Sequence, residues 1–140
     1  EGALCVDSIL FPAMDEALSG LEAAGVRWGI VTNKMARFTV PLVRALGLHE
    51  RAACIVSGDT APKPKPDPAP LLHALAATGA EAGAALYVGD DLRDIQAGRA
   101  AGMRTVAVSY GYLGDGPHYA QWGADHIIDS PAELLSLVQP

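Results

Sequence analysis

A short apolar run that ends in acidic residues constrains the fold of this chain most. Leu86-Tyr87-Val88 is followed directly by Gly89 and Asp90, and Asp94 comes four residues after Asp90. A parallel α/β sheet delivers acidic groups to the carboxyl end of a buried strand in this way, and open α/β sheets bind ligands at that end. Oxygen-rich sites of this kind suit Mg²⁺. The segment therefore predicts a buried parallel strand with an acidic site at its end.

The rest of the chain alternates between apolar runs and amphipathic segments. Glycine follows several of the amphipathic segments, as it does at the ends of helices. The apolar runs lack the period-two pattern of a half-exposed strand, which favours a mainly parallel sheet covered on both faces, a three-layer Rossmann-like α/β fold. The expected strands are residues 26–31, 53–56, 85–88, 105–108 and 125–128, and the expected helices are 14–24, 36–46, 70–78, 92–101 and one that opens at the capping box 130–133.

Length, charge and cysteine content narrow the class of protein. A chain of 140 residues predicts one domain, and the net charge of −6 argues against a nucleic-acid or anionic-membrane partner. No apolar run approaches the length of a membrane span, and the start shows no signal-peptide pattern. Cys5 and Cys54 lie in apolar surroundings, which predicts two buried thiols in a reducing cytoplasm.

Polar residues that can carry chemistry follow the expected strands or their turns. A hydroxyl and backbone N–H at Thr32 and Asn33 can hold a phosphate oxygen. Lys63 begins the Lys-Pro-Lys-Pro-Asp-Pro run at 63–68, where prolines restrict the backbone, so its ammonium can neutralise a phosphate. Asp90 and Asp94 supply charge for a divalent cation, with Asp94 alternatively holding a metal-bound water or the Lys63 ammonium.

Other polar residues have structural explanations. Lys34 and Lys65 are expected to be solvated charges, and Asp67 to shape the proline turn. Asp91 is explained equally well by helix capping and by a contribution to the metal field. The four histidines are interpreted as structural or surface residues, Trp28 and Trp122 as packing residues, and 110–118 as a Gly- and Tyr-rich loop.

The order of these motifs resembles the haloacid dehalogenase superfamily of phosphatases. Thr32 is similar to its second motif, Lys63 to its third, and Asp90 with Asp94 to its fourth. Within the superfamily, the runs at 31–34, 63–68 and 97–102 resemble bacterial phosphoglycolate phosphatases. The runs at 27–30 and 122–125 also resemble a branch that acts on N-acetylmuramic acid 6-phosphate. The resemblance implies Mg²⁺-dependent hydrolysis of a small phosphorylated metabolite through an aspartyl-phosphate, with Thr32 and Lys63 as catalytic residues.

One motif of that superfamily is missing from this sequence. Its nucleophile and acid/base aspartates lie in an Asp-x-Asp-Gly-Thr motif after the first strand, and the nearest candidate, Asp7, has Ile9 in place of the second aspartate. Residues 7–12 instead resemble the linker that returns from the family's cap domain. We therefore expect residues 1–12 to be a linker remnant, residues 13–140 to be the core, and the nucleophile, first strand and cap to be absent.

The missing first strand has a physical consequence. In the family it lies between the strands that end at Thr32 and Gly89, and unpaired buried backbone groups cost about 1–3 kcal/mol each. Such a gap would remove most of the roughly 5–15 kcal/mol stability of a domain. We expect a longer natural protein, another segment in the gap, or a poorly folded chain, and residues 3–6 are apolar enough to fill it.

Two classes of function remain open at this point. The first is a phosphatase, with either a phosphoglycolate-like molecule or a sugar phosphate such as N-acetylmuramic acid 6-phosphate as its substrate. The second is a non-catalytic α/β module that keeps the fold and has lost the chemistry. The sequence does not decide the oligomeric state.

Overall fold

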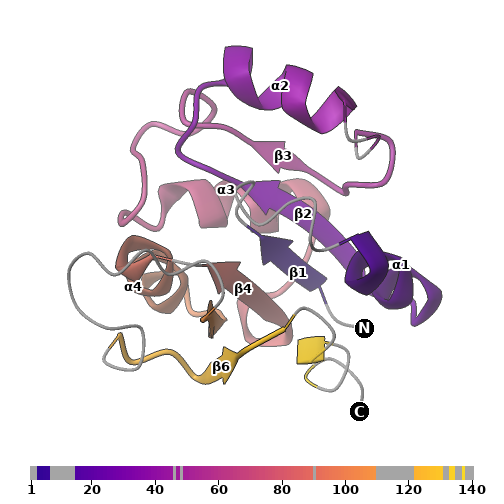
Figure 1. Ribbon diagram of the computed structural model, residues 1–140. Coiled ribbons are helices and arrows are strands. Elements are labelled where there is room, and N and C mark those ends of the chain that lie inside the picture. Colours follow the sequence, from indigo (N-terminus) through magenta and orange to yellow (C-terminus); the bar gives the residue numbers. More distant parts are fainter. Residues whose placement is uncertain are drawn as a thin grey trace.

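The described part of the chain folds around one parallel sheet (Figure 1). The structure is a computed structural model, and it describes residues 3–6, 15–45, 47, 49–89, 91–109, 122–130, 133, 134 and 137. Within these residues the sheet has six strands in the order β3-β2-β1-β4-β5-β6, and each neighbouring pair is parallel. The strands are β1 (Ala3–Val6), β2 (Arg27–Val31), β3 (Ile55–Val56), β4 (Ala85–Gly89), β5 (Arg104–Val108) and β6 (His126–Ile128).

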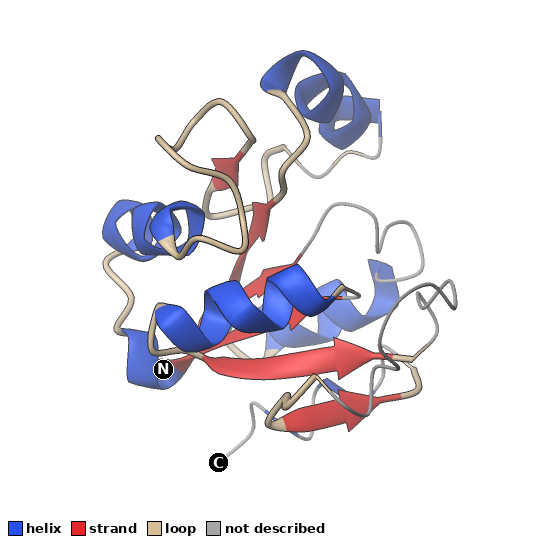
Figure 2. Ribbon diagram, turned by 90° about the vertical axis from the view of Figure 1, so that its left-hand side faces the viewer, coloured by secondary structure: helices blue, strands red, loops and turns tan. Residues whose placement is uncertain are grey.

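Helices cover both faces of this sheet (Figure 2). Leu18 and Leu21 of α1 and Val43 of α2 belong to the core on one face, which includes Trp28 and Leu86. The second face is covered by α3 and α4, whose buried side chains pack around Tyr87. This arrangement confirms the three-layer α/β fold. The helices are α1 (Asp15–Ala23), α2 (Ala36–Ala45), α3 (Ala69–Thr78) and α4 (Leu92–Ala100), with a short 3₁₀ helix η2 (Ala82–Ala84).

Strand β4 shows why the strands read as continuous apolar runs. All five of its residues are buried. Leu86 and Val88 belong to the core on the α1 face, whereas Ala85 and Tyr87 belong to the core on the α3 and α4 face. Because successive side chains of a strand point to opposite faces, a strand that is covered on both sides needs an apolar residue at every position.

Strand β1 occupies the central gap between β2 and β4. Its four residues pair in parallel with β2 on one side, where Leu4 lies opposite Trp28, and with β4 on the other, where Leu4 lies opposite Leu86. The hypothesis that residues 3–6 fill the central gap is confirmed, which is one of the three outcomes expected for a sheet that lacks the family's own first strand. The backbone groups of β2 and β4 that face the gap therefore have hydrogen-bond partners.

The expected elements agree with the described ones to within one or two residues at most ends. Trp28 and Trp122 are buried, as expected for packing residues. Cys54 is a free thiol that is half-buried, whereas it was expected to be fully buried. Its partial burial raises the pKa of the thiol. None of the described helices has the length and apolar character needed to cross a membrane. Asp7, Asp90, the loop expected at 110–118 and most of the C-terminal helix lie outside the described residues.

A polar cluster ties α1 to β2 and to the segment before β3. Glu22 accepts hydrogen bonds from the Arg51 guanidinium, at 3.0 Å from Nε to Oε2, and from the Trp28 indole N–H at 2.9 Å. Arg51 also lies 5.9 Å from the centroid of the Trp28 ring. The hydrogen bond from Arg51 is the main reason that the pKa of Glu22 lies below its ordinary value, with burial opposing it and the Trp28 hydrogen bond adding to it.

Candidate functional site

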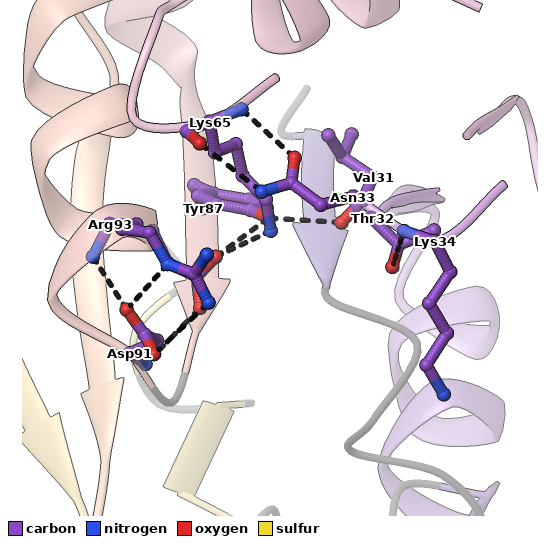
Figure 3. Close-up of polar contacts among 9 residues, drawn as sticks. Val31, Thr32, Asn33, Lys34, Lys65, Tyr87, Asp91 and Arg93 are labelled. Atoms are coloured by element: carbon purple, nitrogen blue, oxygen red, sulfur yellow. Dashed lines mark hydrogen bonds and ion pairs between the residues drawn. The ribbon is translucent and has the colours of Figure 1, made fainter. Parts of the chain in front are cut away.

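A buried lysine lies at the carboxyl edge of the sheet (Figure 3). Lys65 belongs to the segment between β3 and α3 and is only 3% exposed. Its Nζ donates to Asp94 Oδ1 at 2.5 Å and to Tyr87 Oη at 2.7 Å. An ammonium is almost never buried without a charged partner, and Asp94 at the start of α4 supplies that charge. Two elements distant in sequence therefore hold one cation at the end of β4.

Tyr87 connects this cation to the end of β2. Its hydroxyl lies 3.0 Å from the Val31 carbonyl oxygen, to which it donates, and 3.4 Å from Asp94 Oδ1. The tyrosine is fully buried on β4. Since a buried phenol needs a hydrogen-bond partner, the Val31 carbonyl fixes its orientation and leaves its oxygen facing the ammonium. A chain of hydrogen bonds thus runs from Lys65 through Tyr87 to Val31, the residue that precedes Thr32.

The start of α4 fixes Asp94. Asp91 is the N-cap, its side chain accepts from the Arg93 backbone N–H, and Asp94 Oδ2 accepts from the Asp91 N–H at 3.2 Å, which completes a capping box. A Cβ at Gly89 would overlap the Asp94 side chain, so only glycine permits this approach. The helix-cap interpretation of Asp91 is confirmed. Burial raises its pKa, but the hydrogen bonds and charge of Arg93 outweigh this, and the pKa lies below its ordinary value.

Asn33 holds the lysine segment through its side-chain amide. Its Oδ1 accepts from the Lys65 backbone N–H at 2.9 Å, and its Nδ2 donates to the Lys65 carbonyl oxygen at 3.2 Å. Both ends of the amide therefore bind the backbone of one residue that lies far along the chain. The contact of Asn33 with phosphate stays a prediction for its backbone N–H, which these two bonds do not involve.

Thr32 is buried, with 2% of its surface exposed, at the end of β2. Its hydroxyl accepts from the Lys34 backbone N–H at 3.2 Å. Helix α2 begins four residues later, and the N–H of Ala36 donates to Asp59 Oδ1, so Asp59 rather than Thr32 caps that helix. The hydroxyl of Thr32 therefore belongs to the turn at the sheet edge.

The two lysines of the proline-rich run lie in surroundings opposite to those expected. Lys63, the expected phosphate-binding and catalytic lysine, is exposed, whereas Lys65 is buried against Asp94. The prediction that Lys65 is a solvated charge is wrong. Asp67 Oδ1 accepts from the Ala69 N–H, as expected of a residue that shapes this turn, and the Lys65–Pro66 peptide bond is cis. Alternating lysine and proline restricts both lysines alike, so the sequence carries no signal for which one turns inward.

The described residues do not form a complete metal site by themselves. Among them no group of three His, Cys, Asp or Glu side chains is arranged to hold a metal ion. Asp94, an expected metal ligand, accepts from the Lys65 ammonium and from the Asp91 N–H, and its Oδ1 lies 3.4 Å from the Tyr87 hydroxyl. Mg²⁺ in proteins often takes only one or two carboxylates and keeps several waters. The half-exposed Asp91 carboxylate at the same edge fits such a donor set.

Comparison with known proteins shows the family to which the chain belongs. The family model described as haloacid dehalogenase-like hydrolase matches residues 7–108. The N-acetylmuramic acid 6-phosphate phosphatase of Pseudomonas aeruginosa is 44% identical, over 91% of this chain and 57% of its own length. The phosphoglycolate phosphatase of Nitrosococcus oceani is 43% identical, over 94% of this chain and 58% of its own.

The fold has close counterparts among solved structures. A predicted phosphoglycolate phosphatase from Haemophilus somnus superposes with a TM-score of 0.84 at 33% identity, covering 92% of this chain and 57% of that one. The chain thus spans less than two thirds of the length of these relatives. The matched residues include β2 to β5 and the Thr32, Lys65 and Asp94 positions. The chain belongs to the haloacid dehalogenase-like hydrolase family.

Proposed function

We propose that this chain carries the phosphate- and lysine-binding part of a Mg²⁺-dependent phosphatase that hydrolyses a small phosphomonoester through an aspartyl-phosphate. In this proposal the Lys65 ammonium and the Thr32 hydroxyl bind the phosphoryl group, with the Asn33 backbone N–H beside them. The nucleophilic aspartate is not among these 140 residues, because they contain no Asp-x-Asp-Gly-Thr sequence. Lys65 takes the phosphate-binding role that the sequence predicts for Lys63.

The observation that carries the proposal is a buried ammonium at the ligand-binding edge of a parallel sheet. Lys65 and Asp94 form an ion pair whose side chains are each 2% exposed. A fixed, partly dehydrated cation stabilises charge that develops on a phosphoryl group more effectively than a solvated one. Phosphoryl transfer relies mainly on positioning and on electrostatic stabilisation of this kind. The relatives named as phosphatases support the same class of reaction.

Mg²⁺ would be held by carboxylates that follow β4. Asp90, which the sequence places directly after that strand, is the proposed main ligand, and Asp91 follows it. When bound, the ion would neutralise phosphate oxygens and help to orient the ester. Asp94 is proposed as the counter-ion of Lys65 rather than as a direct ligand, because both of its oxygens accept hydrogen bonds within the protein.

The test uses ³¹P NMR to measure the affinity of the chain for orthophosphate in the presence of Mg²⁺. Loss of one charge-assisted hydrogen bond predicts that Lys65→Met weakens binding by about 10- to 100-fold. Lys63→Met, a matched change two residues away, leaves the affinity within about twofold. The double variant Lys65→Met/Asp94→Asn removes both charges of the pair, and it replaces Lys65→Met in this measurement if the single variant does not fold. Equal effects of the two lysine variants would overturn the assignment of Lys65.

Hydrolysis of p-nitrophenyl phosphate tests the nucleophile separately. We expect the chain, with Mg²⁺, to release no phosphate above the buffer rate. Activity that Asp90→Asn abolishes would mean that a carboxylate of this chain, with Asp7 the first candidate, acts as the nucleophile. Absence of phosphate binding altogether would favour the non-catalytic module instead.

The proposed substrate is phosphoglycolate-like, and a sugar phosphate is the second candidate. The relative at 43% identity is named a phosphoglycolate phosphatase, and the relative at 44% is named an N-acetylmuramic acid 6-phosphate phosphatase. Competition of 2-phosphoglycolate and of N-acetylmuramic acid 6-phosphate with orthophosphate distinguishes the two. The proposed substrate displaces orthophosphate at the lower concentration.

A further inference from the structure

The side chain of Asn33 bridges two segments that the proposed function needs in one place. Its amide oxygen accepts from the Lys65 N–H at 2.9 Å, and its amide nitrogen donates to the Lys65 carbonyl at 3.2 Å. The two bonds join the turn after β2 to a residue 32 positions later. Since both bonds end on the backbone of the same residue, they restrain the position of the Lys65 Cα and not only the direction of the loop.

Asn33 itself is fixed by the sheet. The N–H of Thr32 donates to the Val56 carbonyl at 2.9 Å, and the N–H of Gly58 donates to the Lys34 carbonyl at 2.7 Å. A Cβ at Gly58 would overlap the Asn33 carbonyl, so the two backbones are in direct contact there. The turn that carries Asn33 is therefore anchored on both sides of the residue, and the Lys65 segment is attached to it.

We propose that Asn33 is a positioning residue that sets where the Lys65 ammonium lies. Asn33 holds the backbone end of Lys65, while Asp94 and Tyr87 hold the ammonium end (Figure 3). A lysine side chain has several rotatable bonds, so its charge is placed accurately only when both ends are restrained. The effect of Asn33 on phosphate rests on the function proposed above for Lys65, whereas its effect on Lys65 itself does not.

The two functional groups of the amide allow a matched pair of variants. Asn33→Ala removes both hydrogen bonds. Asn33→Asp keeps an acceptor for the Lys65 N–H but places a second acceptor against the Lys65 carbonyl in place of the donor. The control is Thr60→Ala, which removes a hydrogen bond from the Ser57 N–H to the Thr60 hydroxyl at 3.0 Å in the neighbouring loop and does not change charge.

The experiment measures three quantities on wild type and on these variants. NMR gives hydrogen exchange at the Lys65 amide and the ¹H–¹⁵N signal of the Lys65 ammonium, and ³¹P titration gives the orthophosphate affinity. In Asn33→Ala the Lys65 amide exchanges at least about tenfold faster than in Thr60→Ala, and its ammonium signal shifts or broadens. Phosphate affinity falls by about tenfold in Asn33→Ala and by less than about twofold in Thr60→Ala. Asn33→Asp, which carries the same test if Asn33→Ala does not fold, loses affinity as well because its carboxylate repels the Lys65 carbonyl.

Two results separate this inference from the proposed function. If Lys65→Met does not change phosphate affinity, the proposed function is wrong, and the exchange and ammonium signals still decide whether Asn33 places Lys65. If a folded Asn33 variant leaves both Lys65 signals as in wild type, the positioning role is overturned even though phosphate binds.

Discussion

At the scale of single residues, the buried pair of Lys65 and Asp94 is the feature that most needs explanation. Burying two charges costs several kcal/mol per ion, and an apolar pair of similar volume is often as stable. The need to place a cation at this edge of the sheet therefore explains the pair better than a gain in stability does. Removing one partner, however, leaves an uncompensated charge, which makes the pair easy to test.

The two lysines of the proline-rich run should differ sharply in their effect on stability. Lys65→Met leaves the Asp94 carboxylate buried without its cation and should lower the free energy of unfolding by about 3–5 kcal/mol at neutral pH. Lys63→Met changes an exposed side chain and should shift the free energy of unfolding by no more than about 0.5 kcal/mol. Urea denaturation followed by circular dichroism measures both. Similar losses in the two variants would contradict the burial assigned to Lys65.

Tyr87→Phe tests the chain of hydrogen bonds from Lys65 to β2. The substitution keeps the ring but leaves the Val31 carbonyl without the Tyr87 hydroxyl and takes one acceptor from the ammonium. Leaving such groups unsatisfied predicts a loss of about 1–3 kcal/mol. Thermal unfolding gives this loss, and Thr78→Val, which removes a hydroxyl bonded within α3, is the control with a smaller effect. An unchanged Tyr87→Phe protein would show that the hydroxyl does not stabilise the cluster.

At the scale of elements, β1 completes the sheet. The strand is short, yet its position between β2 and β4 gives both of those strands a partner on the side that faces it. A central strand donates and accepts hydrogen bonds on both sides, whereas an edge strand does so on one. Four residues can therefore affect the stability of the sheet more than a longer segment at its edge.

Proline substitutions compare these two positions directly. Leu4→Pro removes a backbone donor from the central strand and should cost about 3 kcal/mol or more. Ile127→Pro acts on β6, which among the described strands lies at the edge of the sheet beside β5, and should cost less. Chemical denaturation measures both variants. If Leu4→Pro unfolds at the same urea concentration as wild type, β1 is not a stable part of the sheet.

At the scale of the whole molecule, the charge distribution links stability to pH. Glu22 and Asp91 have pKa values below their ordinary ones, Glu22 chiefly through Arg51 and Asp91 through Arg93 acting against burial. A carboxyl group whose pKa is lowered by folding stabilises the native state above its unfolded pKa. This contribution is lost as pH falls through the lower folded value.

Glu22→Gln should therefore remove part of the acid sensitivity of the fold. At pH 7 we expect the variant to be less stable than wild type by about 0.5 kcal/mol, a small value because the pair is partly exposed and screened by solvent. Below about pH 4 the difference should shrink, since Glu22 becomes protonated in the wild type as well. The urea concentration at the midpoint of unfolding, measured for both proteins from pH 7 to pH 3, gives this difference in stability. A difference that stays constant over this range would contradict the lowered pKa.

Local pattern in the sequence was sufficient to predict most of this molecule. Apolar runs, glycine stops and the Asp91 cap depend on residues close together along the chain, so β2 to β6, the helices and the three-layer class could be inferred from it. The sheet edge that gathers Thr32, Asn33 and Asp94 followed as well, because parallel strands place their carboxyl ends together.

Only the tertiary structure decided which lysine turns inward and which segment lies at the centre of the sheet. Lys63 and Lys65 have the same local surroundings, and their difference arises from Asn33, Tyr87 and Asp94, which other parts of the chain supply. Residues 3–6 are apolar, but their place as β1 depends on the gap between β2 and β4. Sequence alone thus determined the elements and the edge where they meet, whereas burial of one cation and closure of the sheet depended on contacts between distant segments.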